Sequence, residues 1–276
     1  MIKSSPKWPS LWMIVCLSVF AQGSFSADRP MPAHESFVIR SARLGETRHV
    51  NVYTPPGYAV AKTARYPVLY MPDGGMQEDF PHVATDVDSA IRAGEMRPMI
   101  VIGIENTERR RDMTGPTDVA SDRSIAPHVG GSAVFRAFIA SELMPEVRRR
   151  YRTSSETAIV GESLAGLFVL ETFFLQPKLF DTYVALSPSL WWNDQALLRA
   201  APGRLKAWPR RQVTLYVATS GDDDIDAAGE RLQTILRAHA RPGLVWFYEP
   251  RPDLRHSSIY RGASPGVFRK LFPARK

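Results

Sequence analysis

The sequence predicts an α/β fold in which helices cover both faces of a mainly parallel sheet. Short apolar segments alternate along the chain with segments whose apolar residues recur every three or four positions, the spacings typical of strands and of helices. Apolar runs without polar alternation suit strands that are buried on both faces. Strands that alternate with helices in this way predict right-handed crossovers and a parallel sheet.

The first two strands are expected to form an antiparallel hairpin. Residues 36–40 and 48–53 have the alternation and β-branched content of half-buried strands, and Gly45 marks the turn between them. The later strands are nearly continuous apolar runs at residues 66–71, 99–104, 157–160, 183–186, 213–217 and 244–248.

Helical spacing is clearest over residues 132–150, where one stripe of the helix is apolar. Further helices are predicted at residues 164–175, 227–240 and 265–272. The irregular stretch 105–130 is long for a loop in a compact domain, and such loops tend to be functional. No internal repeat or low-complexity linker is visible, so residues 28–276 are expected to form a single domain.

The first 27 residues have the layout of a secretory signal peptide. Lys3 and Lys7 precede an apolar run at residues 11–20, and small residues follow it. That run is shorter than the roughly 20 residues that a membrane-spanning helix requires. We therefore expect cleavage somewhere between residues 23 and 27, and a periplasmic or secreted protein without a stable membrane anchor.

Composition narrows the classes of function. With 44% hydrophobic and 23% charged residues, the chain is typical of a globular protein. Its one cysteine, Cys16, lies in the predicted leader, so thiol catalysis and thiolate metal sites are excluded from the mature chain. The net charge is +7, but the arginine clusters 109–111 and 148–150 are not interleaved with aromatic residues. A nucleic-acid partner is therefore not expected.

Ser163 is the candidate nucleophile. The stretch Gly161-Glu162-Ser163-Leu164-Ala165-Gly166 falls where a predicted strand meets a predicted helix. A nucleophile elbow lies at such a junction and needs small residues around its serine. Ala165 stands where the strict Gly-x-Ser-x-Gly motif has its second glycine, and we expect this position to be helical. A purely structural turn is the alternative for the motif taken alone.

His256 is the candidate base, because a serine needs a neighbour to take its proton. It follows the last predicted strand, in a polar loop that leads into the C-terminal helix. A triad also needs a carboxylate to orient the imidazole, and an acidic loop, residues 222–226, follows the penultimate strand. Asp224 is our choice. Asp222, Asp223, Asp226 and Glu249 remain alternatives, and so does a merely solvated acidic turn.

Backbone N–H groups are expected to stabilise the oxyanion of an acyl-transfer reaction. The residue after the nucleophile, Leu164, supplies one of them. The second is expected from the glycine-containing loop at residues 72–76, where we favour Gly75 over its neighbour Met76.

These segments together resemble the putative esterase branch of the α/β-hydrolases, which includes esterase D-like enzymes and trilactone siderophore esterases. The resemblance runs from about Val50 to Phe272, and its motifs are residues 66–74, 101–114, 161–168, 186–189 and 256–260. In the elbow, Glu162 and Ala165 replace the family's usual histidine and glycine. The resemblance implies the α/β-hydrolase fold and ester hydrolysis without a metal or cofactor.

The expected activity is therefore hydrolysis of a small-molecule carboxylic ester through an acyl-Ser163 intermediate. An acyltransferase with the same triad and an inactive hydrolase-fold binding protein are the alternatives. Trp191 and Trp192 either hold an acyl or aryl group or pack under a loop. Arg109, Arg110 and Arg111 are candidates to meet an anionic substrate such as a ferric catecholate.

Overall fold

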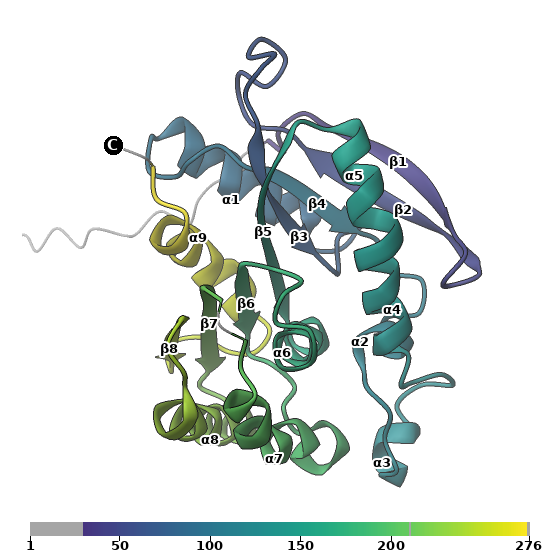
Figure 1. Cartoon of the computed structure of the whole chain (residues 1–276), viewed down its shortest axis with the longest axis vertical. Helices are drawn as coiled ribbons and strands as arrows, with labels where there is room; N and C mark the ends of the chain where they lie inside the picture. The colour runs from purple at the N-terminus through teal and green to yellow at the C-terminus, as the bar shows by residue number, and fades with distance from the viewer. Residues whose placement is uncertain (1–29, 210, 275–276) are drawn as a thin grey trace, which may run out of the picture. The chain divides into compact units, whose positions relative to one another are not determined.

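The computed structural model describes residues 30–209 and 211–274. For Asp223 and Asp224 it describes the main chain but not the side chains. The predicted leader and its cleavage site lie outside these residues. In the described part of the chain, eight strands form one sheet in the order β1-β2-β4-β3-β5-β6-β7-β8 (Figure 1). The strands are β1 (His34–Ser41), β2 (Glu46–Tyr53), β3 (Tyr66–Met71), β4 (Ile100–Ile104), β5 (Thr153–Glu162), β6 (Thr182–Leu186), β7 (Val213–Ser220) and β8 (Leu244–Arg251).

Strand direction follows the prediction of a mainly parallel sheet with an antiparallel N-terminal hairpin. β1 pairs antiparallel with β2, which in turn pairs antiparallel with β4. Every pairing from β4 through β3 to β8 is parallel. The carboxyl ends of the parallel strands therefore lie at one edge, where loops can bring distant side chains together.

The described helices are α1 (Phe80–Arg92), α2 (Arg109–Met113), α3 (Ala120–Arg123), α4 (Ser132–Phe138), the π-helical turn η1 (Ile139–Leu143), α5 (Met144–Arg150), α6 (Leu164–Leu175), α7 (Trp192–Lys206), α8 (Asp223–His239) and α9 (Ile259–Leu271). They cover both faces of the sheet, as predicted (Figure 1). Adjacent strand residues point to opposite faces, so Leu69 joins the core under α1 and α9, whereas Tyr70 joins the core under α4 to α8.

The predicted helix at residues 132–150 contains a π turn between α4 and α5. Pro145 stands at the start of α5, and proline cannot donate to the carbonyl one turn earlier. A local widening of the helix accommodates that loss. By contrast, α6 has the same bounds as the predicted helix 164–175.

Two long helices were not predicted. The helix α7 begins with three residues in the left-handed conformation, at positions 193–195, and has Pro202 in its interior. α1 carries Pro81 in its first turn, a position that tolerates proline. Pro265 lies inside α9, which begins at Ile259, so the predicted helix start at residue 265 was wrong.

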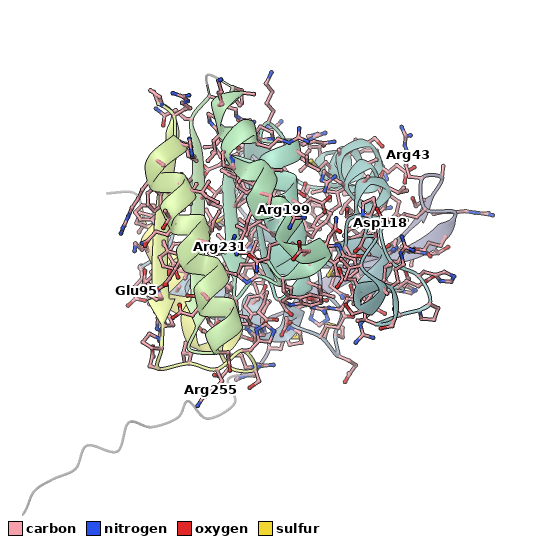
Figure 2. The ribbon with its side chains drawn as sticks, turned by 90° about the horizontal axis from the view of Figure 1, so that it is seen from below. Arg43, Glu95, Asp118, Arg199, Arg231 and Arg255 are labelled. Carbon is pink, nitrogen blue, oxygen red and sulfur yellow. The ribbon has the colours of Figure 1, made fainter. Side chains whose placement is uncertain are left out.

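Charged side chains are spread over the surface. Figure 2 shows Arg43, Arg199, Arg231 and Arg255 at separate places around the molecule. Arg231 of α8 donates to the side chain of Gln195 in α7 at 2.6 Å, which links the two helices on the outer side.

Candidate active site

Ser163 lies between the end of β5 and the start of α6, at the carboxyl edge of the parallel strands. Its backbone has φ 60° and ψ −121°, a conformation that residues other than glycine rarely adopt. Such strain persists only where the surrounding structure fixes it, and it is concentrated at functional sites. The serine has the backbone expected of a nucleophile elbow.

Small residues make this turn possible. A side chain at Gly161 would place its Cβ 2.7 Å from the Cβ of Ala165, and one at Gly166 would come within 3.1 Å of the Leu186 carbonyl oxygen. Ala165 is the second residue of α6, so its position is helical, as expected. Glycine is therefore not needed at residue 165.

His256 brings its ring against the serine. It lies in the loop between β8 and α9, and its Nε2 is 2.9 Å from Oγ of Ser163. Oγ of Ser189 is 3.3 Å from the same serine hydroxyl. Burial lowers the pKa of His256, with a smaller lowering contribution from Arg109. The lowered pKa favours the neutral imidazole, the form that can act as a base.

The other ring nitrogen of His256 contacts a hydroxyl. Nδ1 lies 2.9 Å from Oγ of Ser187, which lies 2.9 Å from Oγ of Ser220. A hydrogen bond from Ser220 lowers the pKa of Asp222, and the main-chain N–H of His256 also donates to that carboxylate, at 2.6 Å. Two hydrogen-bonded hydroxyls therefore lead from the imidazole toward the loop that holds Asp222.

The remaining candidate acids divide into two groups. The side chains of Asp223 and Asp224, including our predicted triad acid, lie outside the described residues. Asp226 accepts from Thr219 at 2.9 Å and Glu249 from Lys270 at 2.9 Å. Neither of these two described carboxylates is hydrogen-bonded to His256.

The predicted oxyanion donors have different environments. The N–H of Gly75 donates to Oε2 of Glu78 at 2.7 Å, so an internal acceptor occupies our preferred donor. The N–H groups of Leu164 and Met76 have no hydrogen-bond acceptor among the described residues. Of the two donors weighed in the loop, Met76 is the available one.

The arginines of the loop after β4 are largely engaged. Arg109 binds both oxygens of Asp73, at 2.7 and 2.9 Å. Arg111 pairs with Glu46 at 2.7 Å and with Asp112 at 2.7 Å. The exposed Arg110 forms no ion pair with a described residue, so it is the arginine of this cluster best placed to meet an anion.

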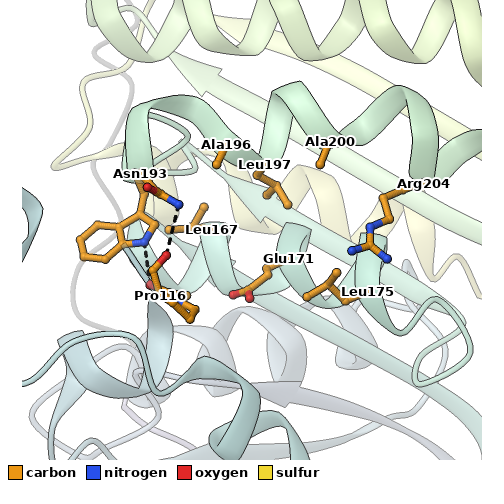
Figure 3. A pocket seen from close by; sticks show the side chains of 11 residues that line it. Pro116, Leu167, Glu171, Leu175, Asn193, Ala196, Leu197, Ala200 and Arg204 are labelled. Carbon is orange, nitrogen blue, oxygen red and sulfur yellow. Dashed lines mark hydrogen bonds between the residues drawn. The ribbon is translucent and has the colours of Figure 1, made fainter. Parts of the chain in front are cut away.

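The two tryptophans have different positions. Trp191 is 42% exposed, whereas Trp192 is buried and donates its indole N–H to the Gly115 carbonyl at 2.9 Å. Trp192 packs under the loop after β4 and borders a cavity of about 180 Å³ between α6 and α7 (Figure 3). Other lining residues of this cavity are Leu167, Leu175, Leu197, Glu171 and Arg204.

The described residues contain no group of three or more histidine, aspartate or glutamate side chains with metal-binding geometry. No described helix combines the length and the hydropathy that crossing a bilayer requires.

Comparisons with known proteins identify the family of the chain. The family model described as "Putative esterase" matches residues 41–244. The ferri-bacillibactin esterase BesA of Bacillus subtilis is 32% identical over 200 residues, which is 64% of this chain and 65% of that protein. The siderophore triacetylfusarinine C esterase of Aspergillus fumigatus is 30% identical over 190 residues, 62% of this chain and 61% of that protein. Both matches span less than two thirds of the relative's own length.

A solved structure extends the similarity. The IroE-like serine hydrolase from Shewanella oneidensis is 27% identical, with a TM-score of 0.80 over 87% of this chain and 80% of that chain. The fold is therefore the α/β-hydrolase fold, as the resemblance implied. The family model covers well over half of the 276 residues. The chain accordingly belongs to the putative esterase family.

Proposed function

We propose that this protein is a serine hydrolase that cleaves carboxylic esters through an acyl-Ser163 intermediate. The observation that carries the proposal is the 2.9 Å approach of His256 Nε2 to the hydroxyl of a serine held in a strained strand-to-helix turn. A nucleophile, a base and an elbow that presents the nucleophile are the elements that acyl transfer requires.

In the first half-reaction His256 accepts the hydroxyl proton as Oγ of Ser163 bonds to the ester carbonyl carbon. The N–H groups of Leu164 and Met76 are our proposed donors to the resulting oxyanion. His256 then gives the proton to the departing alcohol oxygen as the carbon–oxygen bond breaks. In the second half-reaction water attacks the acyl-enzyme by the same proton transfers, which releases the acid and restores Ser163.

The hydroxyls of Ser187 and Ser220 orient the base in this proposal. If Nδ1–H donates to Ser187, Ser187 to Ser220 and Ser220 to Asp222, then Nε2 is left as the acceptor that faces Ser163. Asp222 also accepts a hydrogen bond from the main-chain N–H of His256. We thus assign to Asp222 the role of the acid partner, acting through two hydroxyls.

A siderophore-type ester is our proposed substrate class. The relatives reported above are a ferri-bacillibactin esterase and a triacetylfusarinine C esterase. The exposed Arg110 and the exposed indole of Trp191 offer a charge and an aromatic surface for a large anionic ester. We further propose, from the leader-like residues 1–27, that the protein acts in the periplasm or outside the cell.

Labelling with a fluorophosphonate probe tests the nucleophile. The wild type should label, and Ser163→Ala and His256→Ala should not. Ser141→Ala, a change on the exposed surface of the helix η1, is the matched control and should label like the wild type. Wild-type protein that stays unlabelled, or Ser163→Ala that labels fully, contradicts the proposal. Rates on a short aryl ester and on a trilactone siderophore then test the substrate class.

A further inference from the structure

Glu162 and Ser163 compete for one atom of the base. Glu162 is the last residue of β5 and directly precedes the nucleophile, and its side chain is 15% exposed. Its Oε1 lies 3.2 Å from Nε2 of His256, the same nitrogen that Oγ of Ser163 approaches at 2.9 Å. Two oxygens of adjacent residues thus lie within hydrogen-bonding reach of a single ring nitrogen.

That nitrogen can serve only one of them at a time. A neutral imidazole whose Nδ1–H donates to Ser187 has one lone pair, on Nε2. If Glu162 is protonated, its O–H donates to that lone pair. If the proton lies instead on Nε2, the imidazolium forms an ion pair with the Glu162 carboxylate. In both arrangements the pair contains one proton, and Nε2 is not free to accept the proton of Ser163.

The surroundings of Glu162 favour retention of this proton near neutral pH. The pKa of Glu162 is raised to about 8, chiefly by burial; Arg109 opposes this shift, and Asp73 and Asp79 add to it. Arg109 is already bound by both oxygens of Asp73, so its charge is shared. The charged or titratable groups around the pair are Asp73 before α1, Asp79 at its start, Arg109 on α2, Asp222 after β7 and Tyr260 on α9.

We propose that Glu162 and His256 hold one proton jointly and that Ser163 becomes a nucleophile only when the pair releases it. Glu162 is then a positioning residue that sets the pH at which the base is free, and the enzyme works on the alkaline side of neutrality. Because the two groups titrate as a pair, the conclusion does not depend on which atom carries the proton. This inference rests on the function proposed for Ser163 and His256.

The pH dependence of kcat/KM on a short aryl ester, measured from pH 6 to 9.5, tests the proposal. The wild-type value should rise with pH and level off above about pH 8, a rise of roughly thirtyfold from pH 6.5 to the plateau. In Glu162→Gln and Glu162→Ala the pair cannot hold the extra proton. Their profiles should reach half of the plateau value at or below about pH 6.5, the ordinary pKa of histidine.

Glu249→Gln is the matched control, because Glu249 pairs with Lys270 and not with His256. Its profile should follow the wild type. Thermal melting checks that each variant is folded, and the two substitutions at residue 162 provide independent chances of a folded variant. A wild-type profile that reaches half of its plateau value at or below pH 6.5 overturns the proposal without any variant. A profile in folded Glu162→Gln or Glu162→Ala that matches the wild type also overturns it.

Fluorophosphonate labelling over the same pH range separates this inference from the function on which it rests. Labelling and ester cleavage that are both absent at every pH contradict the hydrolase itself. Labelling that depends on Ser163, but whose pH dependence is the same with and without Glu162, contradicts only the shared proton.

Discussion

Nδ1 of His256 lies 2.9 Å from the hydroxyl oxygen of Ser187, so the nearest described partner of this imidazole nitrogen is a hydroxyl and not a carboxylate. Ser187 directly follows β6 and has a φ of 43°, a strained value that turns its side chain toward the neighbouring loops. A neutral oxygen stabilises an imidazolium less than a carboxylate does. The negative charge of Asp222 acts from farther away and raises the pKa of His256, against the larger lowering by burial.

Ser187→Ala should lower kcat with little change in KM. The substitution removes the acceptor of Nδ1–H, so the imidazole loses its orientation and its preferred tautomer. The loss of one buried hydrogen bond of about 1–3 kcal/mol corresponds to a roughly 5- to 150-fold decrease in rate. Steady-state kinetics on an aryl ester measure it. A kcat within twofold of the wild type would show that the hydroxyl does not orient the base.

Among the acids, Asp222→Ala should reduce kcat more than Asp226→Asn or Glu249→Gln. Asp222 accepts a hydrogen bond from the main-chain N–H of His256 and ends the hydroxyl chain in our proposal, whereas the other two carboxylates have partners elsewhere. Asp224→Asn belongs in the same series, since Asp224 is the acid that the sequence predicts. A decrease for Asp224→Asn as large as that for His256→Ala would assign the triad acid to Asp224 and rule out the hydroxyl chain.

Arg48→Met should destabilise the fold strongly. Arg48 is fully buried and pairs with Asp112, which is also buried, and with Glu46 at 2.5 Å. Removing Arg48 leaves Arg111 as the remaining described partner of both Asp112 and Glu46, so the cost should approach but not exceed the roughly 3–5 kcal/mol of a buried ion pair that loses one partner. Urea unfolding should show this decrease in the free energy of unfolding. The double variant Arg48→Met/Asp112→Asn should recover part of it, and no recovery would argue against the ion pair as the cause.

The stability of the wild type should fall, relative to Glu162→Gln, as pH rises from about 4.5 to about 8. Burial raises the folded-state pKa of Glu162 from the ordinary 4.5 to about 8, so the folded protein binds this proton more tightly than the unfolded chain. This tighter binding contributes fully to the free energy of unfolding below the unfolded-state pKa. The contribution decreases as pH rises and is lost once pH exceeds the folded-state pKa. Urea unfolding at several pH values measures the difference between the two proteins. A constant difference would contradict the raised pKa.

The fold was largely predictable because strand-length apolar runs and the elbow carry strong local signals. Residues 66–71 and 164–175 form the strand β3 and the helix α6 with the predicted bounds. The helix α7 was not predictable in the same way, because its left-handed first turn depends on tertiary contacts. One of these is the bond from the main-chain N–H of Asn193 to Asp122 at 2.7 Å.

The candidate site was predictable in position and less so in detail. Strand order requires the loops that hold Ser163 and His256 to meet at one edge of the sheet, and they do. Which side chain contacts Nδ1 depends on rotamers at the ends of three strands, and sequence spacing does not encode these. Ser187 and Ser220 were visible only as residues in turns after apolar runs. Glu162 was noted as a departure from the family motif, but its distance to the imidazole required the structure.

The strained backbone at Ser163 opposes the stability of the folded protein to the need for a hydroxyl at this position. At a φ of 60° and ψ of −121° a glycine would be less strained than any residue with a Cβ atom. Selection for thermal resistance alone would therefore favour glycine at residue 163. A serine kept in that conformation indicates that the chain gives up some resistance to unfolding in exchange for a hydroxyl that projects from the sheet.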